Sequence, residues 1–282
     1  MGTLPLFVEP NSHRDRALGM ILGAACGARE GRRLQGPRAI ATDWPQAEAV
    51  LLHTGRSLLE VGRFDAADLL RRLIKAWAAQ AGQPKLLRAV NSERPPAPCT
   101  SFIAGLAPIA IIRQTDRKTA QFEALQLART FNATPAEAEA LEVASVFLRR
   151  ALLGGGRDQA LGPMQWEGED QVAAMAAGRS LPLGAPRDLI AAVDQARTVA
   201  LQDVSLAAGF TALRAVQASE AAFILSGMLM GGLQGRALFV RDPFAPQDPL
   251  STCAQLERLG DDLLARLHDA RAHSYAARRH RP

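Results

Sequence analysis

Apolar residues recur along most of the chain at intervals of three and four positions, which is the spacing of one face of an α-helix. The pattern predicts helices over residues 14–28, 45–61, 66–79, 101–114, 118–130, 135–153, 170–177, 188–206, 213–235 and 250–277. No stretch longer than four residues alternates between apolar and polar side chains, as a half-buried strand would. We therefore expect an all-α protein.

Local signals mark several of the expected helix ends. Asp65 precedes the helix at residues 66–79 and is a good N-cap. Thr134 and Glu137 have the spacing of a capping box, and Pro135 suits the first helical position. Three glycines, residues 154–156, end that helix. No linker separates two cores, so we predict one compact domain over residues 1–282, with flexible ends at 1–12 and 271–282.

Glycine falls every fourth residue in two of the expected helices. The first helix has Gly19, Gly23 and Gly27, and a later helix has glycine at 227, 231 and 235. A glycine inside a helix costs about 0.8–1.0 kcal/mol relative to alanine, so six of them require a reason. Because one helical face then carries no side chains, another backbone can approach it closely. We predict that each of these two helices lies centrally, in tight contact with its neighbours.

Composition and charge narrow the class of protein. The chain has 282 residues, of which only 5% are aromatic, and a formal net charge of +5. Lysine occurs three times, so arginine supplies 30 of the 33 basic residues. The arginines are scattered and have few aromatic partners for stacking on bases, which argues against a nucleic-acid partner. The three cysteines have neither disulfide nor metal-ligand spacing, and we expect buried thiols.

Neither a targeting segment nor a membrane span is expected. The first residues lack the apolar run of a signal peptide. The longest uncharged apolar stretch, residues 221–235, is shorter than the roughly 20 residues that cross a bilayer. These features predict a cytoplasmic protein with no membrane contact.

The two glycine-striped helices and the segments beside them resemble the ADP-ribosylglycohydrolase family, over about residues 14–235. In that family the first striped helix is followed by an aspartate, and the position here is Ala28. A Thr-Asp-Asp-Thr motif corresponds to Thr-Asp-Trp-Pro at residues 42–45. An Asp-x-Asp-Thr motif that begins the second striped helix corresponds to Ala-Ser-Glu-Ala at residues 218–221. The phrase Gly-Arg-Phe-Asp at residues 62–65 also fits the family rhythm.

The resemblance implies a fold that holds two magnesium or manganese ions in a cleft, where the glycosidic bond of ADP-ribosyl groups is cleaved. Such hard cations require several converging oxygen ligands. Of the metal ligands that the family implies, this sequence keeps only Thr42, Asp43 and Glu220. We therefore expect no cofactor, with one weakly held magnesium or manganese ion as the alternative. Asp43 and Glu220 are the only candidates for catalysis.

Arginines at positions 29, 32, 33 and 38 follow the first striped helix, and we expect a loop over residues 31–41. If this loop borders the family's cleft, the cleft has lost acidic residues and carries arginines instead. It would then bind anions in place of cations, because an arginine can bind a phosphate group through two hydrogen bonds at once. The ligand-binding candidates are Arg29, Arg32, Thr42, Asp43 and Trp44. The alternative is a solvated basic loop.

Three functions stay open. The first is a pseudoenzyme of the family that binds an ADP-ribose-like or phosphorylated ligand, or a protein partner. The second is a divergent ADP-ribosyl hydrolase that works with one metal ion or none, with Asp43 or Glu220 as general base. The third is an unrelated helical scaffold with a basic surface, or a nucleic-acid-binding protein, and steep salt dependence of binding to DNA would support it.

Overall fold

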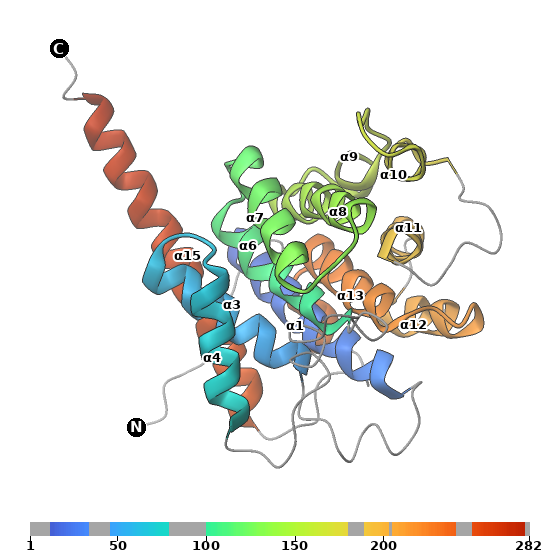
Figure 1. The fold of residues 1–282 in the computed structure, drawn as a ribbon, viewed down its shortest axis with the longest axis horizontal. Coiled ribbons are helices and arrows are strands. Elements are labelled where there is room, and N and C mark those ends of the chain that lie inside the picture. Colours follow the sequence, from blue (N-terminus) through green and yellow to red (C-terminus); the bar gives the residue numbers. More distant parts are fainter. Residues whose placement is uncertain are drawn as a thin grey trace.

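The computed structural model describes residues 12–33, 46–78, 100–179, 189–202, 205–240 and 250–279, and within these ranges it contains helices and no strand. The helices, shown in Figure 1, are α1 (His13–Arg33), α3 (Gln46–Val61), α4 (Ala66–Ala78), the 3-10 helix η1 (Thr100–Gly105), α6 (Leu106–Ile112), α7 (Arg117–Thr130), α8 (Pro135–Leu153), α9 (Arg157–Leu161), α10 (Asp170–Ala176), α11 (Leu189–Leu201), α12 (Leu206–Ala215), α13 (Glu220–Gln234), α14 (Ala237–Val240) and α15 (Leu250–Arg279). The all-α prediction is confirmed.

Helices α1 and α13 lie together in the middle of the molecule (Figure 1) and pack through their glycine stripes. Gly23 faces Gly227, and Gly19 faces Gly231, so the two helices run antiparallel. A Cβ atom added to any of these four glycines would overlap backbone atoms of the facing helix. The prediction of close contact is confirmed, and the neighbour of each stripe is the other stripe.

The remaining helices surround this pair. α13 is buried on all sides from Ala221 to Gly232, as expected for a helix that is apolar all round. α11, α8, η1 and α12 contact α13, whereas α15, α3, α6 and α8 contact α1. One continuous hydrophobic core results, in which the Cys26 thiol is buried. The other two cysteines lie outside the described side chains.

Several helix boundaries follow their local signals. Thr134 and Glu137 form the expected reciprocal capping box, and Gly154 ends α8 with a φ of 82°, in the left-handed region that favours glycine. Asp65 accepts a hydrogen bond from the backbone N of Asp68 at 2.9 Å, as an N-cap does. The capping predictions are therefore confirmed.

Other predicted boundaries are wrong. The first helix continues past residue 28 to Arg33, so the expected loop cannot begin at residue 31. Residues 101–114 form a 3-10 turn followed by α6 instead of one helix. The predicted helix over residues 213–235 is two helices, because Gln217 has a φ of 50° and ends the turn after α12. The predicted helix over residues 188–206 ends at Leu201, and the short α9 was not predicted.

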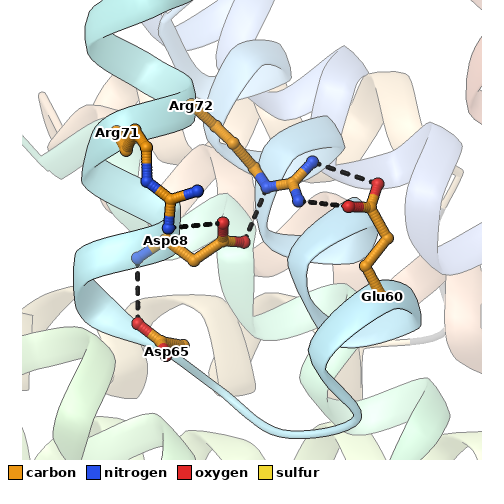
Figure 2. Close-up of polar contacts among 5 residues, drawn as sticks. All are labelled: Glu60, Asp65, Asp68, Arg71 and Arg72. Carbon is orange, nitrogen blue, oxygen red and sulfur yellow. Dashed lines mark hydrogen bonds and ion pairs between the residues drawn. The ribbon is translucent and has the colours of Figure 1, made fainter.

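The corner between α3 and α4 is held by a network of charged side chains (Figure 2). Arg72 binds the carboxylate of Asp68 at 2.6 Å through Nε and the carboxylate of Glu60 through both Nη atoms. Arg71 adds a 3.0 Å ion pair to Asp68. The hydrogen bond from Arg72 lowers the pKa of Asp68, and the two carboxylates raise the pKa of Arg72. The network therefore fixes the angle at which α4 leaves α3.

A buried ion pair ties this corner to α7. Arg113 binds both carboxylate oxygens of Glu123, at 2.9 and 2.8 Å, and donates to the carbonyl of Gly62 at 2.7 Å. The backbone N of Phe64 donates to the same carboxylate at 3.0 Å. Glu123 is 3% exposed. The Gly-Arg-Phe-Asp segment at residues 62–65 is therefore bound to a buried carboxylate.

Helix α15 runs along one side of the molecule, and its C-terminal part extends beyond the other helices in Figure 1. Its leucines at 256, 259, 263 and 267 are buried. Ion pairs from Arg14 to Asp261, at 2.7 Å, and from Arg236 to Glu257, at 2.8 Å, fix it to the start of α1 and the end of α13.

None of the helices within the described ranges has both the length and the apolar character that crossing a membrane requires.

Candidate functional site

The sequence-predicted site residues fall into two groups. Glu220, Arg29 and Arg32 are described, and they lie where the C-terminal end of α1 passes the N-terminal end of α13. Thr42, Asp43 and Trp44 lie outside the described residues, as does position 38. The candidate site is therefore built from the ends of α1 and α13 and the elements that pack against them.

Glu220 is the first residue of α13. A carboxylate at this position is favoured by the positive end of the helix dipole. Its Oε1 atom accepts a hydrogen bond from the Ser101 hydroxyl at 3.1 Å. Gly31 of α1 packs against it so closely that a Cβ there would lie 2.9 Å from the Glu220 Cα. Glu220 is thus held between α1 and η1.

The arginines at the end of α1 are helical, not in a loop, and Arg32 and Arg33 have carboxylate partners. Arg32 makes a bidentate ion pair with Glu48 of α3, at 3.1 and 2.9 Å, and both side chains are mostly buried. Basic residues in the last turn also interact favourably with the negative end of the helix dipole. An anion that binds Arg32 would therefore compete with Glu48.

A second acidic residue, Glu30, joins α1 to α12. Its carboxylate is 2% exposed and forms ion pairs with Arg33 and with Arg214. Its two arginine partners offset the desolvation cost of burying a carboxylate. This cluster links the C-terminal end of α1 to α12.

Apolar side chains occupy the other positions that the resemblance assigns to the metal site. Ala28 and Ala221 are fully buried, and Ala218 is 7% exposed. Phe131, the residue after α7, stacks its ring on Phe102 of η1 with centroids 5.1 Å apart. In the part of the chain that the structure describes, no group of three or more His, Cys, Asp or Glu side chains could hold a metal ion.

Sequence reasoning did not identify the partners of these residues. Ser101, Glu48 and Arg214 were not predicted to belong to the site. Glu30 and Arg214 are 184 positions apart, so no local pattern could have paired them. No local pattern marked Ser101 either, because Glu220 lies 119 positions further along the chain.

No protein-family model and no curated protein matches this sequence. A solved structure described as an "ADP-ribosylglycohydrolase-related protein complex" is similar to the chain, with a TM-score of 0.73 and 19% identity. The similarity covers 90% of this chain and 99% of that one. The chain therefore has the all-α fold of the ADP-ribosylglycohydrolase-related proteins, and the expectation of this fold from the glycine-striped helices is confirmed.

Proposed function

We propose that this chain is a pseudoenzyme, a binding protein that keeps the ADP-ribosylglycohydrolase fold and has lost its dinuclear metal site and hydrolase activity. The observation that carries the proposal is the set of buried apolar residues around Glu220. Ala28, Ala218 and Ala221 offer no oxygen to a cation at positions where the resemblance implies ligands. The described residues do not fit a pair of magnesium or manganese ions.

The ligand we propose is ADP-ribose or a related phosphorylated molecule, bound near the end of α1. Arg29 and Arg32 would contact its phosphates, because guanidinium groups bind phosphate oxygens in pairs. Glu48 competes for Arg32 in the unliganded protein, so Glu48→Gln should strengthen phosphate binding. A protein partner is the other candidate, and the structural neighbour is itself described as a complex.

Calorimetric titration with ADP-ribose tests this proposal, first with magnesium or manganese and then with a chelator. We expect the same affinity in both conditions, and weaker binding by Arg29→Gln and Arg32→Gln. Arg258→Gln is the matched control, since Arg258 is an exposed arginine on α15, away from the site.

Binding that requires metal would contradict the proposal, as would release of ADP-ribose from an ADP-ribosylated protein. Either result would favour the divergent hydrolase, and Glu220→Gln would then show whether Glu220 is its base. If ADP-ribose binds in neither condition, the proposed small ligand is wrong, and a protein partner remains as the candidate.

A further inference from the structure

A cavity of about 380 Å³ opens between α7, α8 and the segment that follows α9, and its lining contains none of the residues of the candidate site around Glu220. Its volume lies within the range of small-molecule and side-chain pockets, roughly 300–1,000 Å³. Leu125 and Pro135 form part of its apolar wall. Three carboxylates and a single arginine, Arg129, also border it. The cavity thus combines an apolar lining with an excess of negative charge.

Glu139 of α8 holds the segment after α9, which forms the third side of this cavity. Its carboxylate accepts a hydrogen bond from Trp166 Nε1 at 2.6 Å and from the backbone N of Glu169 at 3.1 and 3.2 Å. Gly168 lies against the same carboxylate, where any side chain would collide with it. These contacts fix the indole ring of Trp166 at the edge of the cavity. The carboxylate of Glu139 is therefore already occupied by hydrogen bonds within the protein.

Glu142 lies one turn further along the same face of α8, and its carboxylate makes no hydrogen bond or ion pair with the described residues. It is half-buried, and burial together with the charge of Glu139 raises its pKa, while Arg129 lowers it. Arg129 also has no bonded partner among the described side chains and is exposed. A partly buried carboxylate without a bonded partner is costly, and a cation entering the cavity would offset that cost.

The helix that forms the other wall carries an exposed aromatic residue. Phe122 of α7 is 59% exposed and is among the most exposed large apolar side chains described. Phe122, Leu125 and Arg129 are spaced three and four residues apart, so they follow one face of α7 towards the cavity. An apolar residue beside the occupant of the cavity could therefore cover Phe122, which favours a peptide segment over a free ion.

We propose that this cavity binds an arginine side chain presented by a partner protein. The guanidinium group would pair with the carboxylate of Glu142 and stack on the indole ring of Trp166, and the adjoining apolar residue would cover Phe122. A planar cation that can do both at once fits this lining better than a compact ammonium group does. The inference holds whether or not the site around Glu220 binds ADP-ribose.

Titration of the full chain with the peptide acetyl-Leu-Arg-Leu-amide tests the proposal, followed by NMR at the indole Nε1–H resonance of Trp166. Trp166→Phe assigns that resonance. The control peptide carries citrulline, which has the shape of arginine without its charge. We expect the arginine peptide to shift the resonance saturably and the citrulline peptide to bind at least tenfold more weakly. A lysine peptide should bind more weakly than the arginine peptide.

Two variants with opposite expected effects guard against loss of folding as an explanation. Glu142→Gln should weaken binding of the arginine peptide about tenfold, because the paired charge is lost. Arg129→Gln should strengthen it several-fold, because a competing cation is removed. Asp262→Asn, an exposed change on α15, should have no effect.

Three results would overturn the proposal. The first is no shift with the arginine peptide at millimolar concentration. The second is an equal affinity for the citrulline or lysine peptide. The third is weaker binding by Arg129→Gln. In the ADP-ribose titration these variants should behave as the wild type, so failure of one proposal is distinguishable from failure of the other.

Discussion

Replacing Gly23 by alanine tests the contact on which the fold is centred. Alanine adds a single methyl group and is favoured in a helix by about 0.8–1.0 kcal/mol over glycine. In an open helix the change would therefore stabilise the protein. At Gly23 the new Cβ would overlap the carbonyl group of Gly227 and lie 3.1 Å from the backbone N of Met228. Backbone atoms cannot rotate out of the way as a side chain can.

The two helices would therefore have to separate by on the order of 1 Å, which opens gaps along the close-packed remainder of their interface. Overpacking of this kind costs typically about 1–3 kcal/mol, and here it acts on a contact between two backbones. Because neither backbone can yield, the upper end of that range applies, and after subtraction of about 1 kcal/mol for helix propensity we expect Gly23→Ala to lower the free energy of unfolding by about 2 kcal/mol.

Urea unfolding followed by circular dichroism measures this change. Gly260→Ala in α15 is the matched control, because its Cβ would meet only the ends of the Leu18 and Ile21 side chains, at 2.8 and 3.2 Å. These ends can move, so we expect a change of less than about 1 kcal/mol in either direction. A Gly23→Ala protein as stable as the wild type would refute the direct packing of α1 on α13.

The remaining predictions concern a cap, an ion pair and a histidine. Thr134→Ala should cost about 1 kcal/mol in chemical unfolding, since it removes half of the capping box of α8. Glu123→Gln should lower stability by about 2 kcal/mol, because it takes the charge from a buried partner of Arg113; an unchanged midpoint in urea would argue against that pair. Burial, aided by neighbouring arginines, lowers the pKa of His53 to about 4, whereas the unfolded chain has about 6.5. Unfolding then takes up a proton as the pH falls from about 6.5 to about 4, so stability is lost over that window. His53→Gln should reduce the loss between pH 7 and pH 5 by about 1 kcal/mol, after allowing for solvent screening, and identical pH profiles would count against it.

Structural features formed by neighbouring residues were predicted better than contacts between segments that are distant in the sequence. The capping box at Thr134 and the N-cap at Asp65 need only four adjacent residues, and both were found correctly. The break between α12 and α13 was missed, because apolar spacing continues through it and only the positive φ of Gln217 ends the turn. A stripe of glycines predicts a close approach, but it has no side chains with which to specify the partner.

The candidate site shows the same limit. Glu220 was expected at the start of a helix because it follows a family pattern, and it lies there. Arg32 was a candidate for binding an anion, and the sequence around it does not show that Glu48 of another helix pairs with it. Charge pairs between distant segments depend on tertiary packing, which a single sequence does not display.

The pairing of α1 with α13 also sets the order in which the protein can form during synthesis. Gly19 and Gly23 emerge early, whereas Gly227 and Gly231 emerge about 200 residues later. At about 5–20 residues per second, the first helix waits roughly 10–40 s for its partner. During this interval its glycine face and the apolar surface of the other core helices have no cover, so a nascent chain paused before α13 should be a strong client for chaperones. The centre of this protein can therefore assemble only after most of the chain has been made.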